Sequence, residues 1–316
     1  MARRAAFLSE SRKQPEHRLV VGGGNYFAHG DLEQKLLGIT VLQALQRMDY
    51  DALSLGNEDF SYGSDVLLAA LKGTPVVSTN MKWTSGEKLG VPMIVKEYEG
   101  LPMQGRAHDK IKVAVLAFMD EHMQGPIDML LLQDSRKVKI SPMVESAKEW
   151  VPKAHQAAEL VVALVQCNSI DAVPFIQQVP GIDVLVACRT LEEVTTEPRH
   201  EDATVIVANG DRGRYIAELR FDFASLATPE GRAVLLDQRI PEDPAMKTFI
   251  HNSEDNIDAQ FADTLQDPVK APVAPRQRGR NSAPNGHPIP VAPPEPAPTG
   301  PGAAPVPSKP SVPGTP

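Results

Sequence analysis

Polar side chains follow the ends of several short apolar runs, and their types and spacing suggest a binding or catalytic site. They are Asn25, Asn57, Glu58, Asp59, Gln166, Asn168 and Arg189. Ligand sites of α/β folds lie at the carboxyl ends of strands, so we expect these residues to meet there. The oxygens of the first four can hold a hard cation such as Mg²⁺ or Ca²⁺. The alternative is a set of solvated polar loops, which the sparse spacing of the carboxylates favours.

The chain has two cysteines, Cys167 and Cys188, each beside one of these polar residues. Because Arg189 follows Cys188, we expect a lowered thiol pKa and a reactive thiolate. The alternative is two small buried residues at strand ends, the commoner role of unpaired cysteine. Two cysteines exclude a disulfide-rich scaffold and a four-cysteine zinc site.

Alternating strands and helices must position these residues. Near-continuous apolar runs, typical of strands covered on both faces, occur at 19–21, 52–55, 75–79, 111–118, 160–165, 182–187, 204–208 and 215–223. Helical spacing extends over 34–48 and again over 242–265, and Ser64 and Pro142 can each begin another helix. Pro152 is expected to kink or end the helix that Pro142 begins. The alternation predicts an α/β fold.

The end of the chain has a different composition. Of the 29 prolines, 15 lie in the 46 residues from Ala271 onward. We expect a single globular domain over 1–240, a C-terminal helix over 241–266 and a disordered proline-rich tail over 267–316. The tail is expected to be a spacer; the alternative is a docking peptide for a proline-recognising module.

Charge and hydropathy exclude several classes of partner. The chain carries −8 and its tail +3, which leaves −11 on the body and argues against duplex nucleic acid. No apolar run approaches the roughly 20 residues that span a bilayer, and no signal peptide is expected in this chain. The expected partner is therefore a small molecule or a protein.

Four segments carry recognisable motifs in a consistent order. Residues 48–63 contain Gly-Asn-Glu-Asp-Phe-Ser-Tyr-Gly after an apolar run, residues 179–191 contain Gly-Ile-Asp-Val-Leu-Val-Ala-Cys-Arg-Thr-Leu, and residues 208–215 end in Gly-Arg-Tyr. Residues 3–25 hold an arginine pair and then Gly-Gly-Gly-Asn. Together they resemble the N-terminal catalytic domain of the bacterial 5′-nucleotidases, the UshA-like group of the calcineurin-like metallophosphoesterases. The resemblance implies an α/β/β/α sandwich.

The resemblance also implies two-metal phosphoester hydrolysis, in which Asp, Asn and His side chains hold the cations that clamp the phosphate. The family's Asp-Ala-Gly-Asp falls on Gly22 to Asn25, so that its bridging aspartate is the neutral Asn25, which bridges two cations poorly. Its asparagine is kept as Asn57, and its catalytic histidine falls on Glu58. The remaining histidine positions fall on Gln166, Arg189 and Leu191. Arginine would repel a cation and leucine cannot bind one.

The histidines themselves lie elsewhere. None of the eight falls on a family metal position, and His122 and His155 have no evident partner, so we expect both on the surface. The family's Asp-x-His motif would precede Arg3, so the domain is expected to lack its first strand. We therefore expect a degenerate dinuclear site, no bound cofactor, and a binding or scaffold role rather than phosphatase activity. The family is typically periplasmic or extracytoplasmic, which the resemblance implies here.

Two alternatives stay open. A diverged phosphoester hydrolase would hold a divalent cation (Mn, Zn or Mg) at an atypical site around Asn25 and Asn57, with Glu58 at the catalytic position. A thiol-redox protein would use Cys167 and Cys188, whose loops face each other in the family's fold. The resemblance extends to an UshA-like subgroup in which thiol or selenol chemistry replaces metal chemistry.

Overall fold

A six-stranded sheet forms the centre of the computed structural model. The structure describes residues 1–14, 17–27, 32–99, 110–167, 169–189, 199–208, 210, 213–221 and 229–266. Across the sheet the strands are β4 (Ile94–Glu99), β5 (Lys110–Phe118), β7 (Leu160–Val165), β8 (Val184–Ala187), β10 (Thr204–Ala208) and β9 (Arg199–Glu201). The four inner strands are parallel, and each edge strand is antiparallel to its neighbour.

The inner strands are apolar on both faces because both faces are covered. In β7, Val161, Ala163 and Val165 pack with the helices of one face, whereas Val162 and Leu164 pack on the other face. The helices of the first face are α5 (Met143–Ala157) and α6 (Ser169–Gln178).

Short ladders lie against the second face. They are the parallel pair β1 (Val21–Gly22) and β2 (Ala52–Leu53) and the antiparallel pair β11 (Tyr215–Arg220) and β12 (Glu230–Leu235). Val21, Ala52 and Leu219 from these ladders join the core of that face. A further antiparallel pair is formed by β3 (Met81–Trp83) and β6 (Val138–Ile140).

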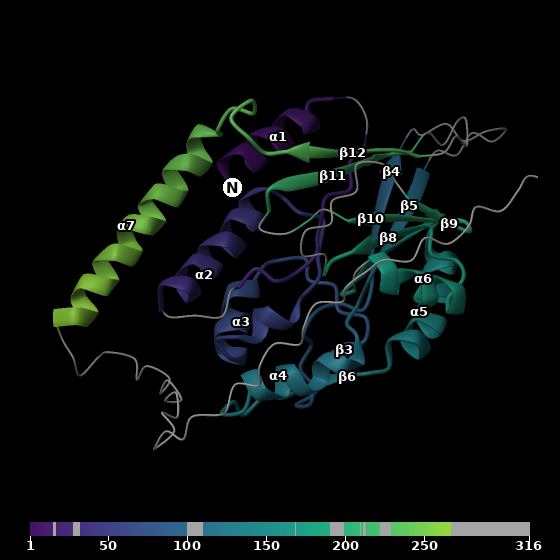
Figure 1. The fold of residues 1–316 in the computed structure, drawn as a ribbon, viewed down its shortest axis with the longest axis horizontal. Helices are drawn as coiled ribbons and strands as arrows, with labels where there is room; N and C mark the ends of the chain where they lie inside the picture. The colour runs from purple at the N-terminus through teal and green to yellow at the C-terminus, as the bar shows by residue number, and fades with distance from the viewer. Residues whose placement is uncertain are drawn as a thin grey trace, which may run out of the picture. The chain divides into compact units, whose positions relative to one another are not determined.

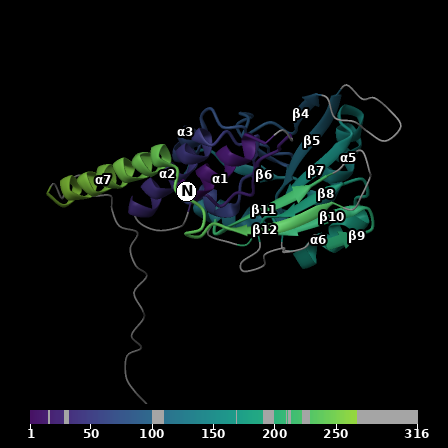
Figure 2. The same cartoon turned by 90° about the horizontal axis from the view of Figure 1, so that it is seen from above.

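An outer helical layer closes the second face. It contains α1 (Ala2–Arg12), α2 (Leu32–Arg47), α3 (Ser64–Leu71) and α7 (Pro244–Gln266), whose apolar residues share one core with β2. Figures 1 and 2 show α1, α2 and α7 grouped on the side away from α5 and α6. The layer order confirms the predicted α/β/β/α architecture. A short helix, α4 (Gln124–Leu130), follows β5.

Several local expectations were wrong. Pro152 was expected to kink or end its helix, and it does not end α5. It lies on the exposed face, where water can bond the carbonyl that its missing N–H leaves unpaired. Ser64 is not a cap: it is the first helical residue, and its N–H and hydroxyl both donate to Asp134. The run 75–79 forms only single bridges, through Val76 and Val77.

The described residues up to Gln266 belong to one compact unit. The predicted tail over 267–316 lies outside the described residues. No helix in the described ranges is long and apolar enough to cross a membrane.

Candidate functional site

Parallel strands that end side by side form one wall of the site. Phe118, Val165 and Ala187 are aligned across β5, β7 and β8. The ladder continues one step further, because the Gln166 N–H donates to the Phe118 carbonyl (3.0 Å) and the Cys188 N–H to the Val165 carbonyl (2.8 Å). Gln166 and Cys188 therefore stand in one row just beyond the strand ends.

The loops after β1 and β2 form the opposite wall. Asn25 follows β1, and a 3₁₀ turn, η1 (Asn57–Phe60), follows β2. The Gln166 side-chain amide donates from Nε2 to the Gly23 carbonyl, which ties the end of β7 to the loop after β1. The fold thus brings together five of the predicted residues: Asn25, Asn57, Glu58, Asp59 and Gln166.

Asp59 braces the two loops of this wall. Its Oδ2 accepts from the N–H groups of Asn25 and Gly56 (both 2.8 Å), and its Oδ1 from those of Tyr26 (2.5 Å) and Phe27 (3.1 Å). The residue is 1% exposed, and this burial raises the pKa of its carboxyl to about 6 although the four N–H bonds lower it. Both oxygens are therefore engaged inside the protein.

The other oxygen-bearing residues also bond within the loops. Asn25 adopts a left-handed backbone (φ 56°), and its Oδ1 accepts from the Glu58 N–H (3.1 Å). The Glu58 carboxylate accepts from Asn57 Nδ2 (3.0 Å) and from the Ser61 hydroxyl (3.3 Å). These bonds fix the conformation of η1 and occupy several of the donors and acceptors that a ligand could use.

The glycine run after β1 has no room for side chains. A Cβ on Gly22 would lie 2.6 Å from the Tyr26 hydroxyl and 2.7 Å from Leu53 Cδ2. A Cβ on Gly24, which has φ +88°, would lie 2.8 Å from Gln166 Nε2. Side chains at Gly22, and the backbone of Leu55 and Gly56 at Gly24, thus fill the space beside this loop.

Gln166 is a deeply buried polar residue at the end of β7. It is 3% exposed, and its Oε1 has no hydrogen-bond partner among the described residues. The amide nitrogen Nε2, and not Oε1, faces the Gly23 carbonyl, because two oxygens could not form a hydrogen bond there.

The two cysteines lie on opposite faces of the sheet. Cys167 packs with Val165 beside the helices α5 and α6, whereas Cys188 packs with Val186 on the other face. Their loops are adjacent, since the Arg189 N–H donates to the Cys167 carbonyl (3.0 Å). The side chains nevertheless point apart, because successive strand residues alternate between faces. The geometry does not favour a redox pair, and no disulfide joins these two residues.

The expectation that Arg189 lowers the pKa of Cys188 was wrong. Burial raises the pKa of this thiol to about 12, and a hydrogen bond from Ser54 offsets only part of that effect. Arg189 directs its Nη1 to Met123 Sδ (3.8 Å) instead. Sequence reasoning missed Ser54 and Tyr26, which lie within a few residues of the predicted loops.

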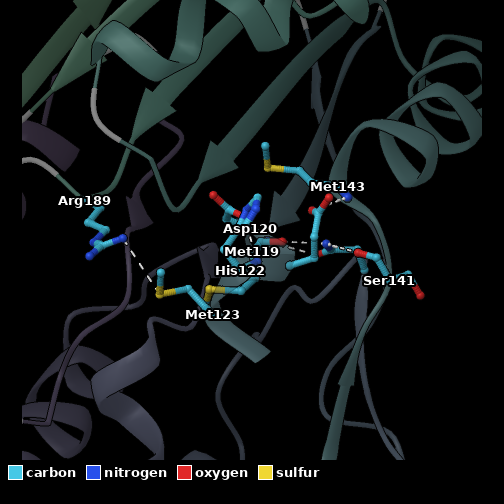
Figure 3. A network of polar contacts seen from close by, with 9 residues as sticks. Met119, Asp120, His122, Met123, Ser141, Met143 and Arg189 are labelled. Carbon is cyan, nitrogen blue, oxygen red and sulfur yellow. Dashed lines mark hydrogen bonds and ion pairs between the residues drawn. The ribbon is translucent and has the colours of Figure 1, made fainter. Parts of the chain in front are cut away.

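A polar network at the end of β5 was also missed (Figure 3). Asp120 Oδ1 bonds both the backbone N–H (2.8 Å) and Nδ1 (2.7 Å) of His122, and this contact raises the pKa of the imidazole. His122 is on the surface as expected, but it has a partner. His155 also has one, the Gly181 carbonyl. The Asp-x-His spacing directly after an apolar run was the available signal.

Two other predicted positions, Asn168 and Leu191, lie outside the described residues.

Comparisons with known proteins find sequence similarity to nucleotide phosphoesterases. No family model matches it. It is 28% identical over 179 residues to the trifunctional nucleotide phosphoesterase protein YfkN of Bacillus subtilis, covering 52% of this chain and 12% of YfkN. It is 25% identical over 210 residues to the 2′,3′-cyclic-nucleotide 2′-phosphodiesterase/3′-nucleotidase of Yersinia enterocolitica, covering 59% of this chain and 31% of that protein. The chain therefore matches less than a third of the length of either relative.

Solved structures of two proteins share the fold. A 5′-nucleotidase precursor from Thermus thermophilus superposes with a TM-score of 0.65 at 20% identity, covering 82% of this chain and 53% of that one. The calcineurin-like phosphoesterase YfkN from Bacillus subtilis gives 0.63 at 21% identity, covering 81% and 89%. The chain has the calcineurin-like phosphoesterase fold. The predicted resemblance is confirmed.

The side chains at the strand ends are poor ligands for the two divalent cations that the resemblance implies. Asn25 and Gln166 are neutral amides, the oxygens of Asp59 each accept two N–H bonds, and Arg189 is a fixed cation. Within the described part of the chain, no three His, Cys, Asp or Glu side chains are grouped so that they could hold a metal ion. We therefore derive no metal-dependent step.

Proposed function

We propose that this protein is a catalytically degenerate member of the calcineurin-like phosphoesterase fold that binds a small molecule or a protein. One observation carries the proposal: the position of the family's bridging aspartate is the neutral amide Asn25, whose Oδ1 already accepts from the Glu58 N–H (3.1 Å). A neutral amide bridges two cations poorly. The motif's other aspartate position, Gly22, has no room for a side chain, because a Cβ there would collide with the Tyr26 hydroxyl and Leu53.

Electrostatics supports the same proposal. Two divalent cations need several anionic oxygens or neutral imidazoles at short distance. Here a family histidine position is Gln166, whose amide instead bonds the Gly23 carbonyl, and another is the exposed Arg189. A guanidinium cannot lose its proton in a protein and would repel a cation beside it.

Turnover measurements test the proposal. Purified protein is assayed with AMP and with a chromogenic phosphate ester in Mn²⁺, Co²⁺ or Zn²⁺. We expect the same background rate from the wild type, from Asn57→Ala and from the exposed control Asn252→Ala. Robust metal-dependent turnover that Asn57→Ala abolishes and Asn252→Ala retains would contradict the proposal.

A further inference from the structure

Arg189 extends across the end of the central strand β7. Its backbone follows β8, yet its Nη1 reaches Met123, which follows β5 on the other side of β7 (Figure 3). Neighbouring strands lie about 4.8 Å apart. The side chains of Arg189 and Met123 together therefore span the two strand spacings from β8 across β7 to β5. The guanidinium therefore lies over the carboxyl edge of the sheet.

The guanidinium has unused hydrogen-bonding capacity. A thioether is a weak acceptor, and a guanidinium carries five N–H donors in a planar fork. Among the described residues, no carboxylate forms an ion pair with Arg189, whereas Arg136 is held by both Asp65 and Glu87. Arg189 is exposed. It is thus available to an anion from solvent.

A second donor, His122, is the residue directly before the same methionine. The His122 side chain is 83% exposed, and its Nδ1 faces Asp120, which leaves Nε2 on the far side of the ring. The neighbouring carboxylates have local partners: Asp120 holds His122, and Glu121 accepts from the Met143 N–H (2.9 Å). These hydrogen bonds weaken the repulsion between the two carboxylates and an incoming anion but do not remove it.

We propose that Arg189 and His122 form a binding site for a small oxyanion at the carboxyl edge of β5, β7 and β8. The inference rests on the proposed function, because it replaces a metal-bridged anion with one held directly by side chains. The guanidinium fork would bind two oxygens of a phosphate, sulfate or carboxylate group. The protonated Nε2 of His122 would donate a further hydrogen bond to an oxygen of the same group.

Proton NMR of the histidine ring signals tests this site at pH 6.5. Inorganic phosphate, sulfate and acetate are each titrated against sodium chloride at constant ionic strength, in EDTA. The signal that His122→Gln removes is assigned to His122. We expect it to shift with saturation on addition of phosphate or sulfate. Saturation by acetate as well would extend the site to carboxylates, and saturation by acetate alone would restrict it to them.

Matched variants assign the binding to the guanidinium. Arg189→Gln should weaken the apparent affinity about tenfold or more, Arg189→Lys less, and the exposed control Arg214→Gln not at all. The unmoved signals of the other histidines verify that each variant is folded. A shift that never saturates, that chloride reproduces, or that survives in Arg189→Gln overturns the site. EDTA removes metal ions from this test, so its result is independent of the hydrolysis assay above.

Discussion

Replacing Asp59 with asparagine tests which of two opposing effects dominates the pKa of this buried carboxyl. Burial disfavours the charged carboxylate, whereas four backbone N–H bonds favour it. Burial dominates, and it raises the pKa of the Asp59 carboxyl from its ordinary 3.8 to about 6. Asparagine keeps the shape of the side chain but has no proton to lose in this range.

The sign and size of the effect follow from linkage. Between pH 3.8 and 6 the folded state holds the Asp59 proton more firmly than the unfolded state, so stability falls as the pH rises through this window. From pH 4.5 to 7.5 the wild type should lose about 2 kcal/mol at this site, and Asp59→Asn should lose none of it. The stability of the variant relative to wild type should therefore improve by about 2 kcal/mol across the range.

Urea unfolding at pH 4.5, 6.0 and 7.5 measures this difference. Trp83 is a convenient fluorescent probe, because it is buried and packs edge-on against Phe60, the residue after Asp59. Asp128→Asn, on the exposed face of α4, is the matched control and should show no comparable slope. A flat difference for Asp59→Asn, or one of opposite sign, would refute the reasoning and mean that the N–H bonds outweigh burial.

Three further results are expected from the packing. Gly22→Ala should destabilise the protein by about 1–3 kcal/mol in thermal unfolding, and adding Tyr26→Phe should recover part of the loss; a neutral Gly22→Ala would contradict the close contact. Cys167 and Cys188 should resist iodoacetamide at pH 7.5 until the protein is denatured, because both are largely buried and burial raises the pKa of Cys188 to about 12; rapid labelling of the folded protein would contradict this. Asn80→Ala should cost about 3 kcal/mol in urea unfolding, since its buried amide bonds backbone groups of two segments, and a loss below about 1 kcal/mol would contradict that role.

The inner strands could be predicted from the sequence because burial on both faces requires continuous apolar runs. The run 160–165 is β7, and 204–208 is β10. β4 was missed because it has no continuous apolar run. It is an edge strand in which half-buried residues alternate with exposed ones, including Glu97 and Glu99. The three-residue ladders β3 and β6 are too short to give a periodic signal.

The juxtaposition of several candidate residues could be predicted from the sequence, but their geometry only partly. The positions of Asn57 and Gln166 followed from strand ends and motif order. The faces of Cys167 and Cys188 could have been inferred from the two-residue period: each cysteine lies two residues beyond a strand residue of known face, Val165 or Val186. The engagement of Asp59 by four N–H groups depends on loop conformations that neither period nor composition specifies.

Equilibrium binding of Mn²⁺ is the most direct test of the degenerate site, because it needs no knowledge of a substrate. Free Mn²⁺ is measured by electron paramagnetic resonance as the ion is titrated into metal-free wild type, Asn25→Ala and Asn57→Ala. The account predicts less than one tightly bound ion per chain and no difference between the three proteins. Two tightly bound ions in wild type, lost in both variants, would contradict it.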